Sequence, residues 1–90
     1  MGKCVPSGGL NPPITGNNID ERFGNPNSLT RLFDALGNLI RERWFGPDGW
    51  AIWDRDHSAH HGAPNPHDHP WRRGPNGPER QRWVDPSGSC

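Results

Sequence analysis

The middle of the chain carries the only hydrophobic pattern long enough to build a core, and this pattern supports two interpretations. Within residues 28–56 apolar positions recur every three or four residues, which is typical of an amphipathic helix capped by Ser28. Gly37 and Asn38 lie inside that stretch, and a glycine within a helix costs about 1 kcal/mol relative to alanine. The periodic apolar residues are Leu29, Leu32, Phe33, Leu36, Ile40 and Trp44.

The alternative is an antiparallel meander in which two turns separate three strands. The run that ends at Gly37 suits a short turn with glycine in the left-handed conformation. The run Gly46-Pro47-Asp48-Gly49 suits a second turn, with proline at its second position. We favour the meander, since Gly37 and Asn38 fit a turn better than a helix interior. It predicts strands over Leu29–Phe33, Leu39–Phe45 and Trp50–Asp54.

The two flanking segments are rich in residues that interrupt regular structure. Residues 1–27 alternate prolines, glycines and asparagines, which predicts an irregular arm. Residues 57–90 have almost no aliphatic side chains, and their prolines argue against a long helix or a central strand. We therefore expect a small single domain, α+β or mainly β, with a three-stranded meander followed by an irregular lobe rich in histidine and proline.

Composition limits the class of protein. The chain has 90 residues, of which 12 are glycine, 11 are proline and 29% are hydrophobic, so one small domain is the most it can form. We divide it into an irregular arm over 1–27, a His-rich domain over 28–73 and a Pro/Gly/Arg-rich tail over 74–90. No stretch approaches the ~20 apolar residues of a membrane span, which predicts a protein with no membrane partner.

Charge and cysteine content say little about the partners or the disulfide state of the chain. Ten basic residues balance ten acidic ones, so bulk charge does not indicate a non-specific grip on nucleic acid. Nine of the ten basic residues are arginine, which favours fork-like contacts to phosphate or carboxylate groups. Cys4 and Cys90 lie near the two ends of the chain, and their number does not decide whether they pair.

All five histidines fall within residues 57–69, with aspartates next to them and between them. Neutral imidazole and carboxylate groups are common zinc ligands. On a strand Asp54 and Asp56 would point to one face, and so would His67 and His69 if their segment is extended. These four residues predict a metal-binding pocket in which zinc is the favoured divalent ion.

The same side chains also suit metal-free acid–base chemistry. Two imidazoles on opposite sides of a phosphodiester, with an arginine to stabilise the developing charge, suffice to cleave RNA through its own 2′-hydroxyl. Arg43 and Arg72 are candidates for that arginine, and Trp71 is a candidate for stacking on a base. A solvated, proline-broken surface loop is the alternative interpretation of the whole histidine-rich segment.

The order of the motifs resembles a known module. The run from Arg43 to Gly49, then Asp54-x-Asp56, a histidine–glycine step and the run from Pro66 to Trp71 resemble a C-terminal module of bacterial polymorphic toxins. Similar modules end some phage structural proteins. The resemblance covers about residues 28–73. It implies a nuclease acting on RNA in a bacterial or phage-infected cytoplasm, with secretion through a delivery system left open and a cognate inhibitor protein as partner. The functional residues it implies are Asp54, Asp56, His61, His67 and His69.

Two hypotheses of different class follow. The first is an enzyme that cleaves phosphodiester bonds, with RNA as the favoured substrate and the aspartates and histidines as the catalytic set. The second is a non-catalytic binding module from a phage or mobile element, which holds a protein, a nucleotide or a metal ion at a structural His-rich site. Turnover of labelled RNA or DNA separates them.

Overall fold

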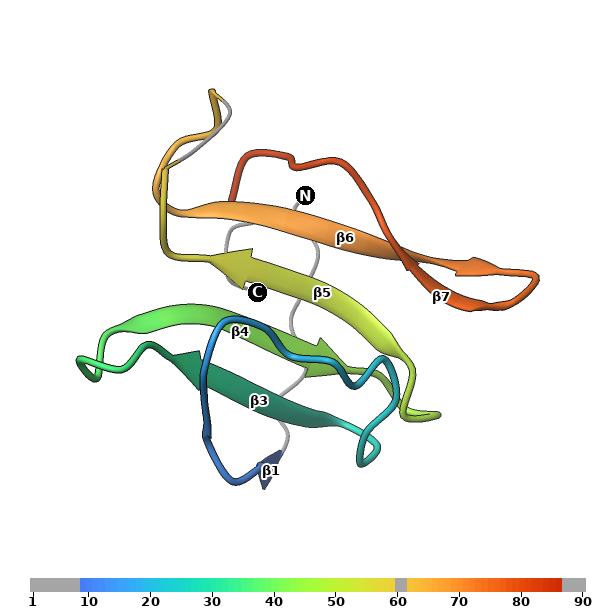
Figure 1. Ribbon diagram of the computed structural model, residues 1–90. Helices are drawn as coiled ribbons and strands as arrows, with labels where there is room; N and C mark the ends of the chain where they lie inside the picture. Colours follow the sequence, from blue (N-terminus) through green and yellow to red (C-terminus); the bar gives the residue numbers. More distant parts are fainter. Residues whose placement is uncertain (1–8, 60–61, 87–90) are drawn as a thin grey trace.

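The computed structural model describes residues 9–59 and 62–86, and these residues form one curled β-sheet (Figure 1). The strand order is β1-β3-β4-β5-β6-β7, and β2 also pairs with β3. No helix occurs in the described segments, so none there is long and apolar enough to cross a membrane. The strands are β1 (Gly9–Leu10), β2 (Ile14–Thr15), β3 (Ser28–Phe33), β4 (Leu39–Phe45), β5 (Ala51–Asp56), β6 (His67–Gly74) and β7 (Gly77–Arg80).

The mainly β prediction is confirmed, and β3, β4 and β5 form the antiparallel meander. Both turns depend on a glycine in the left-handed region, with φ of 84° at Gly37 and 83° at Gly49. Asp34 supports the first turn, because its carboxylate accepts backbone N–H groups of Leu36 and Asn38, each at 2.9 Å. These local bonds explain why the apolar periodicity does not produce a helix.

The segment after residue 57 is more regular than its proline content predicts, because β6 extends the meander and carries Pro70 within it. In a strand the backbone nitrogen and the carbonyl oxygen of one residue point toward the same neighbouring strand. The carbonyl of Pro70 accepts the backbone N–H of Gln81 at 2.8 Å, so the nitrogen that lacks a hydrogen faces away from β5. Proline is therefore compatible with β6, and His67 and His69 lie on a strand rather than in an irregular lobe.

The N-terminal arm belongs to the same fold. Strands β1 and β2 pair in parallel with β3, and the connection from β2 to β3 crosses the sheet in front of β4 (Figure 1). Ile19 in this connection is only 2% exposed. The backbone carbonyls of Ile19 and Glu21 accept hydrogen bonds from the Arg43 guanidinium at 2.7 and 3.0 Å, which fixes the arm over the sheet.

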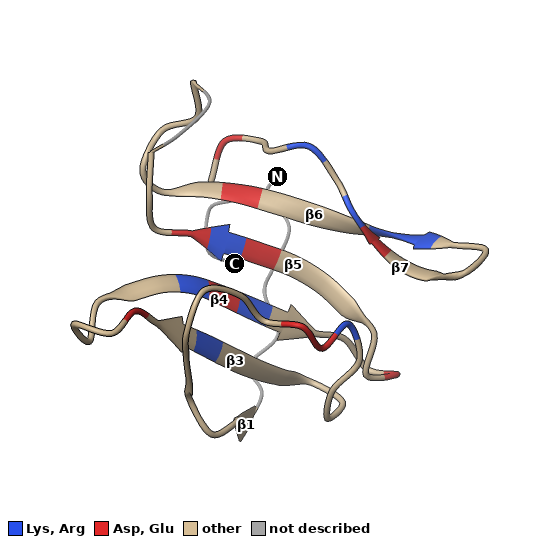
Figure 2. Cartoon of the chain, in the orientation of Figure 1, with Lys and Arg blue, Asp and Glu red and all other residues tan. Residues whose placement is uncertain are grey.

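Charged residues alternate along the two central strands, as Figure 2 shows for β4 and β5. Alternation sends neighbouring side chains to opposite faces, and the cross-strand register then groups them. We call the two groups the site face and the opposite face. The site face carries Arg41, Arg43, Asp54, Asp56, His67 and His69, and the opposite face carries Arg31, Glu42, Trp53, Arg55 and Asp68.

The interior is unusually polar. Its main apolar side chains are Leu32 and Phe45, each 1% exposed, together with Ile19. Among the described residues more polar or charged side chains are buried than apolar ones. Buried ion pairs therefore make up much of the contact between strands. Each charged side chain depends on its partner to offset the cost of its removal from water.

Candidate metal centre

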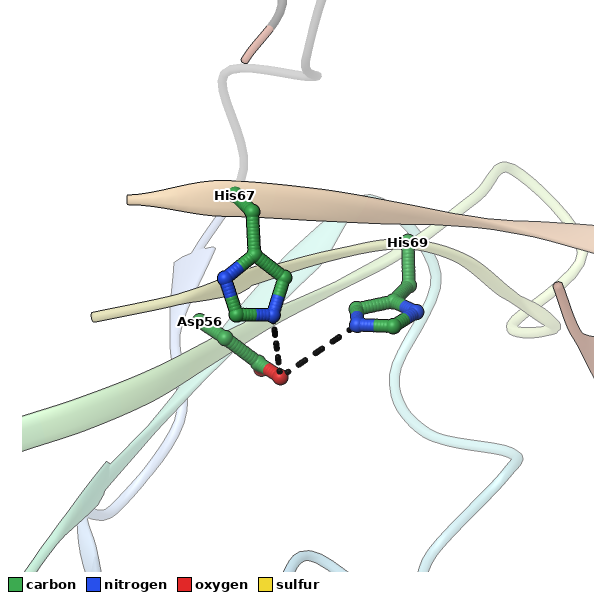
Figure 3. Close-up of side chains that lie close together, drawn as sticks. All are labelled: Asp56, His67 and His69. Atoms are coloured by element: carbon green, nitrogen blue, oxygen red, sulfur yellow. Dashed lines mark ion pairs between the residues drawn. The ribbon is translucent and has the colours of Figure 1, made fainter. Parts of the chain in front are cut away.

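Three side chains of the site face converge where β5 meets β6. Asp56 is the cross-strand partner of His67, and Asp54 is that of His69. The two imidazoles descend from β6 toward the carboxylate of Asp56 on β5 (Figure 3). One donor atom from each of Asp56, His67 and His69 lies within 4.8 Å of the other two. This group has the ligand types and the spacing to hold a metal ion.

Backbone carbonyls fix both imidazole rings. His67 Nδ1 lies 2.8 Å from the carbonyl oxygen of Pro64, and His69 Nδ1 lies 2.8 Å from that of Gln81. A carbonyl oxygen only accepts hydrogen bonds, so each Nδ1 must carry the hydrogen. In a neutral ring the Nε2 atom then presents a lone pair. This is how metal-ligating histidines are usually oriented, with the second nitrogen held by a hydrogen bond to a carbonyl or carboxylate.

Both Nε2 atoms face the same carboxylate oxygen. Asp56 Oδ2 lies 3.4 Å from His67 Nε2 and 3.5 Å from His69 Nε2. These separations are long for hydrogen bonds. They are close to the distance between neighbouring donor atoms around tetrahedral zinc, about 3.3–3.4 Å for bonds of about 2.0–2.1 Å. His69 Nε2 is buried and makes no hydrogen bond within the described part of the chain. The two separations from Asp56 Oδ2 thus match those between ligands of one zinc ion.

Burial and nearby charge keep His69 and Asp56 in the forms that bind metals. Burial lowers the pKa of His69, and the positive charge of Arg80 lowers it further, against the opposing effects of the Gln81 carbonyl and Asp56. Burial alone would raise the pKa of Asp56, but its bonds and charge interactions with Arg41 and Arg80 outweigh this and lower it. These shifts favour the neutral imidazole of His69 and the ionised carboxylate of Asp56. Histidine and aspartate bind metals in these forms.

Two arginines hold the carboxylate of Asp56. Arg41 Nε donates to Oδ1 at 2.6 Å, and Arg80 Nη2 donates to Oδ2 at 2.7 Å. Arg80 also reaches Asp54 Oδ2 through its Nε at 3.0 Å. Sequence reasoning missed both arginines. For Arg41 a signal was present in the complementary runs Arg-Glu-Arg at 41–43 and Asp-Arg-Asp at 54–56, which predict ion pairs once the strands are placed in register.

The predicted ligand Asp54 has a different environment from Asp56. Its side chain is fully buried, and its two oxygens accept Nε and Nη2 of Arg43 at 2.8 and 2.9 Å. It is not one of the three converging donors. Asp54 therefore lies beside the group as half of a buried ion pair, and the predicted fourth ligand is not brought into the cluster.

The residues predicted to bind substrate are dispersed. Arg43 is 2% exposed, and its guanidinium carbon lies 4.6 Å from the centroid of the Trp71 ring, so these two side chains pack together inside the site face. Arg72 is exposed and pairs with Glu79 across the β6–β7 hairpin. His61 lies outside the described residues, as do Cys4 and Cys90.

A pocket of about 420 Å³ lies elsewhere on the molecule. Prolines, Phe23 and Phe45 contribute to its walls beneath the N-terminal arm. Asp56, His67 and His69 do not line it. The pocket and the converging donors are therefore separate features, and the chemistry of the donors does not depend on this pocket.

No protein-family model, curated protein or solved structure matches the chain. The resemblance to a toxin module stays a prediction made from motifs.

Proposed function

We propose that the chain is a zinc-dependent phosphodiesterase whose metal ligands are Asp56, His67 and His69. The observation that carries the proposal is the convergence of two Nε2 atoms on one carboxylate oxygen, at 3.4 and 3.5 Å, with both Nδ1 atoms held by backbone carbonyls. An arrangement of three acceptors that face one another is stabilised by a cation between them.

The ligand set favours zinc among the divalent ions. Two imidazoles and one carboxylate suit zinc better than magnesium or calcium, which prefer oxygen ligands. Catalytic zinc sites have three protein ligands and keep one position for water or substrate, whereas structural sites usually have four. Bound zinc lowers the pKa of a coordinated water and so supplies a nucleophile near neutral pH.

The arginines around the site favour an anionic substrate. Three guanidinium groups, of Arg41, Arg43 and Arg80, surround the two carboxylates of Asp54 and Asp56, so these five side chains carry one excess positive charge. Arg80 is the most exposed of the three, at 31%. A phosphate group that approaches from solvent would meet this guanidinium first, and arginine binds phosphate oxygens in a bidentate fork.

Metal content and turnover test this function together. Purified protein should contain one zinc per chain and cleave labelled RNA or DNA, and a chelator should abolish cleavage until zinc is restored. His69→Gln should remove both zinc and activity. His57→Gln is the matched control, because His57 pairs with Glu42 on the opposite face. Zinc-free protein with full cleavage activity would contradict the proposal.

A structural metal site is the second candidate, and burial favours it. Asp56 is 1% exposed and His67 is 0% exposed, so a bound ion would be shielded on the side of these ligands. A zinc ion there would join β5 to β6 in a domain whose apolar core is small. Under this alternative the protein binds zinc stoichiometrically and zinc raises its melting temperature, but no nucleic acid is cleaved.

A further inference from the structure

Arg80 contacts the carboxylate oxygen that a metal ion at this site would bind. Its Nη2 donates to Asp56 Oδ2 at 2.7 Å, which is the oxygen that both Nε2 atoms face. Its Nε donates to Asp54 Oδ2 at 3.0 Å, so one guanidinium bridges both aspartates. Arg43 bonds Asp54 and Arg41 bonds Asp56, whereas Arg80 bonds both carboxylates.

The remaining arginines can hold the two aspartates without Arg80. Arg43 forms a bidentate pair with Asp54, with both N–O distances below 3.0 Å. Arg41 bonds both oxygens of Asp56, at 2.6 and 3.4 Å. Each carboxylate therefore keeps a guanidinium partner when Arg80 leaves. Arg80 is also the arginine with the easiest route to solvent, because its side chain is 31% exposed and lies at the end of β7.

We propose that Arg80 is an internal cation that occupies Asp56 Oδ2 in the metal-free protein and competes with the metal ion for it. The inference rests on the proposed metal site and adds its regulation. The guanidinium and a divalent ion are both drawn to the same oxygen and repel each other. Metal binding then displaces the guanidinium from Asp56 toward solvent.

The displaced guanidinium has a consequence for ligand binding. A guanidinium released from Asp56 beside a bound divalent ion forms a two-cation site for an oxyanion, such as the phosphate of a nucleic acid. Metal and oxyanion binding are then coupled, and linkage requires that each strengthens the other by the same factor. Inorganic phosphate should bind the zinc-loaded protein more tightly than the metal-free protein.

Zinc affinity of charge variants tests the competition. Removal of the guanidinium in Arg80→Gln should tighten zinc binding by about tenfold or more, since a cation a few ångströms from a divalent ion repels it strongly even with solvent screening. Arg80→Lys keeps the charge and should bind zinc with nearly wild-type affinity. Arg82→Gln is the matched control, because Arg82 is exposed and two residues away, and it removes the same charge. Competition with a chromophoric chelator gives each dissociation constant, and tryptophan fluorescence reports whether each variant is folded.

The outcomes separate this inference from the proposed function. Tighter zinc binding by Arg80→Gln, with Arg82→Gln unchanged, supports competition. Unchanged or weaker binding by a folded Arg80→Gln, while wild type binds zinc, overturns the inference and leaves the metal site intact. A loss of folding in Arg80→Gln would itself contradict the claim that Arg41 and Arg43 suffice. No zinc binding by wild type or by any variant would overturn both proposals.

Discussion

The two faces of the sheet use the same residue types for different purposes. On the opposite face Glu42 accepts hydrogen bonds from Arg31 Nε at 3.1 Å and lies 2.8 Å from His57 Nε2. Asp68 accepts from Arg55 Nε at 2.8 Å and from the indole nitrogen of Trp53 at 2.7 Å. Each of these four contacts joins a carboxylate to a group that can donate a hydrogen.

On the site face the balance of donors and acceptors is different. His67 and His69 both give their Nδ1 hydrogen to a backbone carbonyl and turn Nε2 toward Asp56. His57 instead contacts its carboxylate directly, at ordinary hydrogen-bond distance. A histidine next to a carboxylate is therefore not enough for a metal site. His67 and His69 differ from His57 in that a backbone carbonyl holds Nδ1 of each ring and both Nε2 atoms face one shared carboxylate oxygen.

Replacement of His67 or His69 should reveal the largest difference in zinc affinity between the two faces. His67→Gln or His69→Gln should weaken zinc binding by more than about 100-fold, since even changes to the groups that orient ligands cost about 10–100-fold. His57→Gln should leave zinc affinity unchanged. Isothermal titration with zinc measures all three. Equal losses in the His57 and His69 variants would mean that the two faces do not differ as described.

Removal of a carboxylate on the opposite face should affect stability rather than metal binding. Asp68→Ala leaves the buried Trp53 indole N–H without its acceptor and removes the ion pair between Asp68 and Arg55, which should cost about 2 kcal/mol of unfolding free energy. Urea unfolding in the presence of chelator measures the loss. The folded variant should retain wild-type zinc affinity, and a large drop in that affinity would contradict the division into two faces.

Acid should destabilise the metal-free site face through His69. Its pKa is lowered from 6.5 in the folded state, chiefly by burial, so folding favours the neutral ring. The resulting stability is fully present above pH 6.5 and is lost as pH falls from there through the folded-state pKa. A histidine NMR titration of the metal-free protein should place the His69 midpoint below 6.5. A midpoint at or above that value would contradict the burial of a neutral ring.

The smallest effect is expected at the rim of the opposite face. The side chain of Arg31 is 42% exposed in its pair with Glu42. Arg31→Gln should therefore change the unfolding free energy by less than about 1 kcal/mol, because exposed ion pairs contribute little. Urea unfolding of this variant beside Asp68→Ala gives the contrast directly. A loss as large as that of Asp68→Ala would show that the pair is more important than its exposure indicates.

Local signals were sufficient to predict the meander but not the strands that follow it. Turn residues at Gly37 and Gly49 fixed the ends of β3, β4 and β5 to within two residues. Strands β6 and β7 were not predicted because they contain Pro70 and Pro78, and proline is normally excluded from central strands. Whether a proline is tolerated depends on which side its nitrogen faces, and that is set by strand pairing rather than by local sequence.

The candidate site was predicted in part for a similar reason. The period of two along a strand correctly predicted that Asp54 shares a face with Asp56 and that His67 shares one with His69. The sequence did not show that Arg43 would hold Asp54 in a buried pair. Nor did it show the backbone carbonyls that orient the imidazoles, because carbonyl positions depend on the path of the whole chain.

The most direct test of the account is a crystal structure of the protein grown with zinc, with anomalous diffraction recorded at the zinc edge. We expect one strong peak within about 2.0–2.2 Å of Asp56 Oδ2 and of the Nε2 atoms of His67 and His69. An absence of any peak among these three atoms, or a peak between His57 and Glu42 in its place, would contradict it.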